Sequence, residues 1–510
     1  MLRGTIGLAE SETPLLVHAP EVSMPYAQSL SVTTSNGPPQ DSVLLLSAVS
    51  PLPVDNGKRA VLNGLVNYLV GRLGSEHVHY GIVVAAGEDL PELPCQVHRL
   101  PRPPAVRQLG NVLTKTLQGR SLQECALSSP ALTAGVAGLL ETVQPTLEIY
   151  DTLRLAQHAP DRRYGSRVVY LDDLFSVRYQ RMLTLLDDGQ LTGIDFLGEF
   201  AANIPSFARR VVTRPSVARR LLRLEQRLIT RSEDAVVEHF DLSLLVNSDE
   251  VEQLRARTGS PDVQVISPLV PEPSRVTTRT RARPELVFLG RLNIPHNDDA
   301  ICTFLREVLP AAQARIPGLG LRIIGRSPSR TLQSLAEAAG PSVRLEGFVE
   351  DLDEALGACS LLIAPLQFGS GVKIKILDSL ARGLPVLGTT TAVEGIPVAP
   401  AGHDGFVVED DLQGWPELIA GLLEPAANER ASAAARSFYL RVYAPDQVEA
   451  QYDELFPQVP STARVDLRRE ATATPAADVI DLDAGRPAPD VIDLTDERTR
   501  RREDAVARSS

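Results

Sequence analysis

Short apolar runs alternate along the chain with segments in which apolar residues recur every three or four positions. The runs occupy residues 42–49, 80–85, 147–154, 167–173, 240–248, 263–266, 285–290, 321–325, 343–347, 361–365 and 385–389. Runs of this length predict strands buried on both faces, and the helical spacing between them predicts crossover helices. Regular alternation of strand and helix gives parallel sheets with right-handed crossovers. We therefore expect an α/β protein in which two doubly wound, Rossmann-like domains face a cleft.

Breaks in this pattern divide the chain into parts. We expect an N-terminal Rossmann-like domain at 41–270, a linker rich in Pro, Thr and Arg at 271–284, and a C-terminal Rossmann-like domain from 285 to 445. Residues 1–40 are polar with scattered prolines, and residues 457–510 are rich in Pro, Ala, Asp and Arg. Such segments bury too little apolar surface to fold, so we expect a poorly ordered N-terminal segment and a disordered tail.

A glycine-rich turn follows the apolar run at 361–365. The turn residues are Gly369, Ser370 and Gly371. Helical spacing resumes at Val372, and Gly383 is a typical residue to end that helix. A turn between a strand and a helix N-terminus offers unpaired backbone N–H groups at the positive end of the helix dipole. The pattern predicts a seat for an anion.

Two lysines, Lys373 and Lys375, lie in the first turn of that helix. The helix dipole disfavours cations there by about 0.3–1 kcal/mol each, and a bound anion would reverse that effect. The chain has 51 Lys and Arg residues together, but only four are lysines. An ammonium is a compact point charge, whereas a guanidinium is a planar fork, so the smaller head group points to a specific need in this turn. We favour a phosphate seat, and the alternative is a solvated helix start with incidental lysines.

Candidate site residues also follow other strands. Gly290 and Arg291 end the run at 285–290, so Arg291 should reach the same sheet edge as Lys373. In the first domain, Gly57 lies in a turn between a strand and a helix, where it either contacts a phosphate or acceptor or is only a structural glycine.

Two carboxylates, Asp172 and Asp173, follow the run at 167–173. At the carboxyl edge of a parallel sheet they are candidates for catalysis or acceptor binding. Asp173 would equally suit a helix N-cap.

An arginine-rich segment extends from Phe207 to Arg231, with Pro215 at the expected helix start. We expect one apolar stripe on this helix, formed by Val217, Leu221, Leu224 and Leu228. A surface helix packed on its own sheet is the favoured interpretation. Peripheral membrane contact through residues 215–231 is the alternative, because basic amphipathic helices bind anionic lipid.

Composition excludes several classes of function. The formal net charge of −13 over 510 residues argues against general nucleic-acid binding. No apolar run is long enough for a transmembrane helix, and residues 1–40 lack the pattern of a signal peptide, so we expect a protein of the cytoplasm or of the inner face of the membrane. The four cysteines are scattered, which favours buried thiols. Asp351 and Asp353 have the spacing of a metal-binding Asp-x-Asp pair, but helix capping is the simpler explanation.

The second half resembles the retaining glycosyltransferases of the family-4 type, which have the GT-B fold. The resemblance is carried by residues 288–292, 297–300, 321–325, 347–349, 365–378, 383–386 and 394–396. It implies that the second domain binds a nucleotide-diphosphate sugar, that the first binds a glycan, lipid-linked or small-molecule acceptor, and that no further cofactor is required. It also implies that a final helix, within 446–456, crosses back onto the first domain.

The resemblance assigns roles residue by residue. Arg291 and Lys373 would bind the donor diphosphate, and the backbone around Val349 would lie near the base. Asp378 stands where the family has a glutamate that holds the ribose, and Ser370 stands where it has a glutamate that holds the sugar. No histidine of the first domain matches the family's histidine securely, and His158 is a weak candidate.

Fixed cations would then stabilise the leaving phosphate without a metal ion. The departures at Ser370 and Asp378 keep two alternatives open. The chain could be a catalytically silent binding subunit, or a sugar-nucleotide epimerase or phosphorylase of the same fold.

Overall fold

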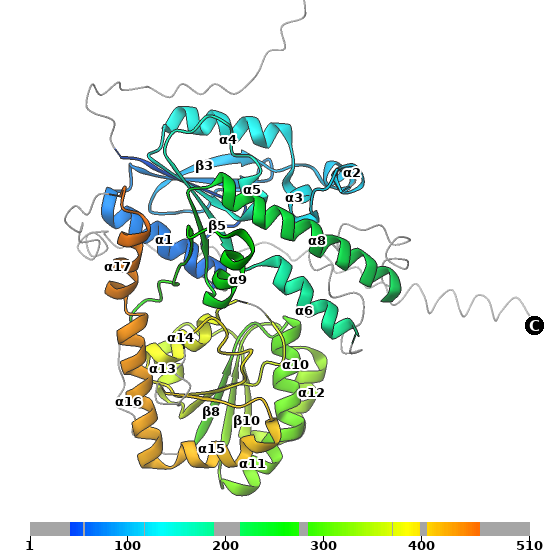
Figure 1. Ribbon diagram of the computed structural model, residues 1–510. Coiled ribbons are helices and arrows are strands. Elements are labelled where there is room, and N and C mark those ends of the chain that lie inside the picture. The colour runs from blue at the N-terminus through cyan, green and yellow to red at the C-terminus, as the bar shows by residue number, and fades with distance from the viewer. Residues whose placement is uncertain are drawn as a thin grey trace, which may run out of the picture. The chain divides into compact units, whose positions relative to one another are not determined.

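The computed structural model describes residues 41–54, 57–116, 118–187, 215–274, 284–369, 371–397 and 405–459. The described residues belong to one compact unit that begins at Asp41. The predictions for residues 1–40, for the tail beyond residue 459, for most of the linker and for Ser370 lie outside the described residues. Helices flank both faces of each of two sheets (Figure 1).

The first sheet has seven parallel strands in the order β3-β2-β1-β4-β5-β6-β7. The strands are β1 (Val43–Ser47), β2 (Val78–Val84), β3 (Gln96–Pro101), β4 (Leu147–Asp151), β5 (Ser166–Asp172), β6 (Leu242–Leu245) and β7 (Val263–Val265). The helices are α1 (Gly57–Leu73), α2 (Ala105–Lys115), α3 (Leu122–Leu127), α4 (Pro130–Val143), α5 (Thr152–Ala156), α6 (Phe175–Asp187), α8 (Pro215–His239) and α9 (Ser248–Thr258).

Both faces of this sheet are buried, as the apolar runs predict. Along β1, Leu44 and Leu46 pack into one apolar cluster, while Val43 and Leu45 pack into a second cluster on the opposite face. Because side chains alternate along a strand, only a continuous apolar run can cover both faces. The run at 147–154 is shorter than predicted as a strand, because Thr152 adopts a φ of 62° and turns the chain into α5.

The second sheet has six parallel strands in the order β10-β9-β8-β11-β12-β13. The strands are β8 (Glu285–Leu289), β9 (Gly320–Ile324), β10 (Val343–Glu346), β11 (Leu361–Ala364), β12 (Val386–Gly388) and β13 (Phe406–Val408). The helices are α10 (Pro295–Thr303), α11 (Leu309–Arg315), α12 (Arg330–Ala339), α13 (Leu352–Gly357), α14 (Ile374–Ala381), α15 (Trp415–Leu423) and α16 (Pro425–Val442). One continuous apolar cluster forms the core of this sheet and its helices.

Helix α17 (Pro445–Leu455) follows α16 and packs against the first sheet rather than the second. Its Tyr452 ring meets the ring of Tyr68 in α1 edge to face, with centroids 5.1 Å apart. The Tyr68 hydroxyl donates a hydrogen bond to Asp453 Oδ1 at 2.7 Å. Helix α17, although it follows the second domain in the sequence, therefore completes the core of the first domain.

The inward face of α8 differs from the predicted stripe. Leu222 and Ile229 are buried together with Leu228 of the predicted stripe, whereas Leu221 and Leu224 of that stripe are exposed. The reason is Glu225, which is buried and accepts the Leu122 backbone N–H at 2.9 Å through Oε1. Because this carboxylate faces inward to cap α3, the buried face of α8 is rotated relative to the face that hydropathy alone would bury.

Among the described residues, no helix has both the length and the apolar character needed to cross a bilayer.

Candidate functional site

The turn between β11 and α14 has the strand, glycines and helix start that the sequence predicts. Gly369 and Gly371 have φ values of 133° and 73°, which other residues adopt at a cost. Gly383, with a φ of 63°, follows the helix end. The helix begins at Ile374, two residues later than predicted, so Lys373 occupies the N-cap position.

Lys373 is almost fully buried, with 8% of its surface exposed. Its Nζ donates a hydrogen bond to the Gly371 carbonyl oxygen at 2.5 Å. Burial lowers the pKa of this ammonium to about 8, and the negative charge of Glu394 opposes that shift. Burial deprives the Lys373 ammonium of the water that would stabilise its charge. A bound anion would compensate for that loss with its negative charge, so this turn is suited to bind one.

Lys375 supports the same turn from inside the domain. Its Nζ donates to Asn297 Oδ1 at 2.9 Å and lies 4.5 Å from the centre of the Phe288 ring. Burial lowers its pKa to about 7, and repulsion from Lys373 lowers it further. Lys375 is therefore partly deprotonated near neutral pH, and Lys373 becomes so about one pH unit higher, whereas a bound anion would favour the charged form of both.

Asn297 connects Lys375 to the turn after β8. Its Nδ2 donates to the Arg291 carbonyl oxygen at 3.0 Å, so one side chain links Arg291 to the lysine turn. A Cβ on Gly290 would lie 3.1 Å from Asn297 Nδ2, and a Cβ on Gly325 would lie 1.8 Å from the Gly290 carbonyl oxygen. Both glycines thus allow the close approach that brings the Arg291 backbone beside the lysine pair.

His296 belongs to this site, although it is not among the predicted site residues. A Cβ on Gly369 would lie 3.6 Å from its ring, and the ring meets Phe368 edge to face with centroids 6.3 Å apart. Burial lowers the pKa of His296 to about 3, helped by the charges of Lys375 and Lys373, so the imidazole is neutral. A Pro-His-Asn triplet at the helix start after Arg291 is the signal that was available.

The residues expected near the nucleoside lie after β10 and within α14. Val349 is half-buried against the core, and the preceding Phe348 is 65% exposed with the Arg326 guanidinium 4.2 Å from its ring centre. Asp378 is half-buried in α14, and its Oδ1 lies 3.3 Å from Arg382 Nη1. Burial raises the pKa of Asp378 while Arg382 opposes the shift.

The Asp-x-Asp pair has structural partners. Asp351 Oδ1 accepts the Glu354 backbone N–H at 2.8 Å, which is the expected helix cap. Asp353 Oδ1 lies 2.7 Å from Arg382 Nη2, and its Oδ2 accepts the Ser274 hydroxyl at 2.6 Å. Within the described ranges, no group of three or more His, Cys, Asp or Glu side chains is arranged to hold a metal ion.

The two first-domain carboxylates have different surroundings. Asp172 follows an irregularity in the pairing of β5 with β6, has a φ of 72°, and accepts the Tyr170 hydroxyl at 2.7 Å. Burial raises its pKa to about 6, with Lys58 opposing the shift. Asp173 is buried and accepts Arg178 Nε at 3.0 Å. Asp172 is therefore the carboxylate that a local backbone irregularity aims at the sheet edge.

Gly57 and Lys58 form the start of α1. A Cβ on Gly57 would lie 3.4 Å from both Ile374 Cγ1 and the Val372 carbonyl oxygen, so Gly57 contacts the start of α14. Lys58 Nζ forms an ion pair with Asp151 at 2.6 Å. Lys58 therefore pairs with a carboxylate at the end of a strand in its own sheet, unlike Lys373 and Lys375.

An ion pair between α6 and the segment after β12 was not predicted. Arg181 Nη1 donates to Glu394 Oε2 at 2.7 Å, and Nη2 lies 2.5 Å from Oε1. Asn247 Nδ2 also donates to Glu394 Oε1, at 3.0 Å. These contacts bring the first domain to the Glu394 carboxylate, whose charge also acts on Lys373. Arg181 and Glu394 are far apart in the sequence, so no local sequence pattern could have predicted their contact.

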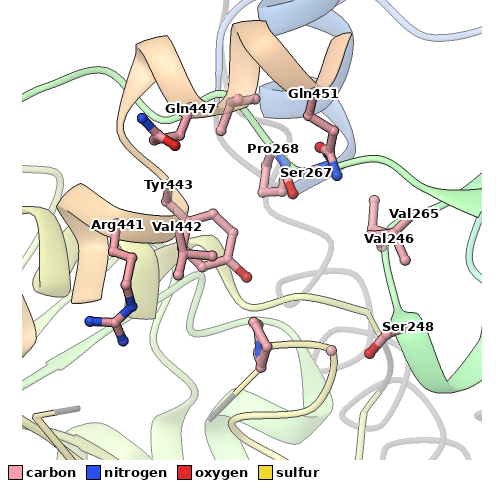
Figure 2. Close-up of a pocket in the computed structure, with 13 residues that line it drawn as sticks. Val246, Ser248, Val265, Ser267, Pro268, Arg441, Val442, Tyr443, Gln447 and Gln451 are labelled. Carbon is pink, nitrogen blue, oxygen red and sulfur yellow. Dashed lines mark hydrogen bonds between the residues drawn. The ribbon is translucent and has the colours of Figure 1, made fainter. Parts of the chain in front are cut away.

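A separate cavity of about 400 Å³ lies where α16 meets α17. Figure 2 shows side chains from the end of α16 and from α17 on one side, and from the segments after β6 and β7 on the other. Gly395 is part of its lining, but none of the predicted site residues is. The cavity is therefore distinct from the Arg291 and Lys373 site.

Comparisons with known proteins agree with this arrangement. Residues 283–425 match the family model described as glycosyl transferases group 1. An exopolysaccharide phosphotransferase of Streptomyces coelicolor is 28% identical over 219 residues, which are 42% of this chain and 22% of that protein. A phosphatidyl-myo-inositol mannosyltransferase of Mycolicibacterium smegmatis is 26% identical over 141 residues, 27% of this chain and 36% of that protein. The chain thus spans only about a quarter to a third of the length of these relatives.

Solved structures resemble most of the chain. A sucrose-phosphate synthase from Thermosynechococcus elongatus has a TM-score of 0.57 at 15% identity, covering 82% of this chain and 98% of that one. A glycosyltransferase from Rickettsia africae has a TM-score of 0.52 at 10% identity, covering 83% and 100%. HepE from Anabaena, in complex with UDP, has a TM-score of 0.50 at 12% identity, covering 82% and 100%. The chain therefore has the GT-B fold, and residues 283–425, within its second domain, are similar to glycosyl transferases group 1.

Proposed function

We propose that this protein is a glycosyltransferase that moves a sugar from a nucleotide-diphosphate sugar to a glycan, lipid-linked or small-molecule acceptor, with retention of anomeric configuration. The observation that carries the proposal is the buried ammonium of Lys373 at a glycine turn. Nearby, Lys375 donates to Asn297, which in turn donates to the Arg291 backbone carbonyl oxygen, so the turn after β8 lies beside the lysine turn. The UDP complex of HepE, and a second with UDP-glucose, support a nucleotide sugar as the donor.

The chemistry follows from where negative charge develops. Transfer breaks the bond between the anomeric carbon and the diphosphate oxygen, and the departing diphosphate gains charge. Donors fixed in a site sheltered from water stabilise that charge without reorganisation. We assign this role to Lys373, Arg291 and the N-terminus of α14, with no metal ion.

The nucleoside would lie at the ends of β9 and β10. Phe348 and Arg326 there provide an exposed aromatic ring beside a guanidinium, a surface on which a base can stack. Asp378, paired with Arg382, is close to the start of α13 and would accept ribose hydroxyls. On the acceptor side, Asp172 is our candidate to contact the reacting hydroxyl, and Asp173 positions Arg178.

The test is a screen of UDP-, GDP-, ADP- and dTDP-sugars for thermal stabilisation, followed by product analysis with a chelator present. A specific donor at about 100 times its Kd adds about 2.7 kcal/mol of stability. We expect one nucleotide class to stabilise the protein and the anomer of the product to match that of the donor. Inversion, or activity that disappears with the chelator and returns with Mg²⁺, would refute the corresponding part of the proposal.

The Streptomyces relative favours a second candidate, transfer of a sugar phosphate. That reaction breaks the bond between the two phosphates and releases a nucleoside monophosphate, whereas glycosyl transfer releases a nucleoside diphosphate. Identifying the released nucleotide separates the two reactions. Release of neither, despite donor binding, would favour a silent binding subunit.

A further inference from the structure

The outward face of α8 combines arginines with leucines. Arg220, Arg227 and Arg231 are exposed, and so are Leu221 and Leu224, at 39% and 44% of their surface. On a helix, residues 220, 224, 227 and 231 follow one another at intervals of three or four and so form one stripe, with Leu221 on the adjoining row. Leu224 therefore lies within a row of guanidinium groups.

The opposite face of α8 explains why this surface has a single sign of charge. Residues 215–231 contain five arginines and one acidic residue, Glu225. Glu225 points inward, where both its oxygens accept the Leu122 backbone N–H, at 2.9 and 2.8 Å. Leu222 and Ile229 flank it in the core, and α8 packs along α6 (Figure 1).

The exposed cations are not balanced locally. Arg220, Arg227 and Arg231 have no carboxylate partner among the residues that the structure describes. The whole chain, in contrast, has a net charge of −13. A concentrated positive face on an acidic protein selects an anionic partner by complementarity.

We propose that this face of α8, residues 216–231, docks on the surface of an anionic lipid bilayer. Lipid phosphates would pair with the arginines, and Leu221 and Leu224 would enter the boundary between headgroups and acyl chains. A soluble acidic polymer would use the arginines but would gain nothing from the leucines, which is why the observations favour a bilayer. The inference goes beyond the proposed transfer reaction, because docking requires no sugar nucleotide.

The experiment is flotation of the full chain with vesicles of phosphatidylcholine alone or of phosphatidylcholine mixed equally with phosphatidylglycerol. We expect binding to the anionic vesicles only, weakening with added salt. Arg220→Gln combined with Arg227→Gln should lower the partition coefficient roughly 25-fold, since each arginine near the surface contributes about fivefold. Leu221→Ser combined with Leu224→Ser should lower it roughly tenfold or more.

Matched controls lie on the second domain. Arg315→Gln combined with Arg430→Gln removes two exposed arginines, and Leu440→Ser removes a leucine that is 45% exposed. These variants should bind vesicles like the parent protein, and all variants should keep its melting temperature and its response to donor sugars. Equal binding to neutral vesicles, or no binding to either kind, would overturn the proposal. So would a leucine variant that binds like the parent while the arginine variant does not, because that result indicates a simple polyanion site.

Discussion

Asn297 accepts a hydrogen bond from Lys375 Nζ at 2.9 Å and donates one to the Arg291 carbonyl oxygen at 3.0 Å. An amide can do both, whereas a carboxylate at this position could only accept. The side chain is buried, so each lost hydrogen bond has a measurable cost. Two substitutions separate its two roles.

Asn297→Ala leaves the half-buried Lys375 ammonium without the Asn297 acceptor, so we expect a loss of about 1–3 kcal/mol in the free energy of unfolding and weaker donor binding. Asn297→Asp keeps an acceptor for Lys375 but repels the Arg291 carbonyl oxygen. It should preserve stability while still weakening donor binding. Denaturant unfolding and donor titration measure the two effects, and parallel losses in both variants would contradict the assignment.

Lys373→Ala should lower turnover by roughly 10²–10³-fold, the scale for losing one charge-stabilising donor. Lys115→Ala is the matched control, because Lys115 lies in α2 and its Nζ contacts the Ser128 hydroxyl. Steady-state kinetics with the donor identified by screening measures both variants. A decrease of less than tenfold for Lys373→Ala would contradict the proposed role of Lys373 in stabilising the leaving diphosphate.

Donor binding should take up protons above neutral pH. Burial lowers the pKa of Lys373 to about 8 and that of Lys375 to about 7, so both are partly neutral at pH 8 in the free protein. A diphosphate stabilises the charged forms and raises both pKa values, so affinity should fall as the pH rises above about 7. Calorimetry at pH 8 in buffers of different ionisation enthalpy reports the uptake directly, and identical heats across the buffers would show that neither lysine couples to the donor.

Phe348→Ala should weaken nucleotide binding roughly tenfold, because stacking of a base on an aromatic ring contributes about 1–3 kcal/mol. Binding of inorganic pyrophosphate should be unchanged, since Phe348 lies apart from the lysine turn. Comparing the two ligands by titration distinguishes loss of the base contact from general damage. Equal weakening of both would place the base elsewhere.

Tyr452→Ala should lower the free energy of unfolding by about 3–5 kcal/mol, as for other large buried aromatic residues. Tyr452→Phe keeps the ring against Tyr68 and loses only the hydrogen bond from the hydroxyl to the Ser267 carbonyl oxygen, 2.7 Å long, so it should cost about 1 kcal/mol. Chemical denaturation measures both. Similar small losses would mean that α17 contributes little to the first domain.

Local signals predicted most of the fold. The runs that became β1 and β11 are continuous in the sequence, and Gly371 and Gly383 mark real changes in backbone direction. Strand β3 escaped prediction because all but one of its positions are exposed or half-exposed, because polar residues interrupt its apolar ones, and because it ends at Pro101. Edge strands of this kind lack the apolar run that identifies a central strand.

The site was less predictable because part of it depends on contacts between distant segments. Arg181 meets Glu394, and His296 lies beside Gly369, without any spacing rule that joins them. The orientation of α8 likewise depends on Glu225, which caps α3 from inside the domain. Hydropathy alone would place this glutamate on the solvent side of α8. Charge patterns identify which residues are unusual, but only packing shows which of them are neighbours.

The position of α17 has a consequence for biosynthesis. The apolar surface beneath it includes Val43 near the start of the described chain, yet Val448 and Phe456, which cover that surface, are translated roughly 400 residues later. At the usual rate of translation, tens of seconds pass between the synthesis of the first strand and that of α17, and during this time the apolar surface stays exposed to water. We therefore expect ribosome-bound chains that stop before α17 to recruit chaperones, and released full-length chains to shed them.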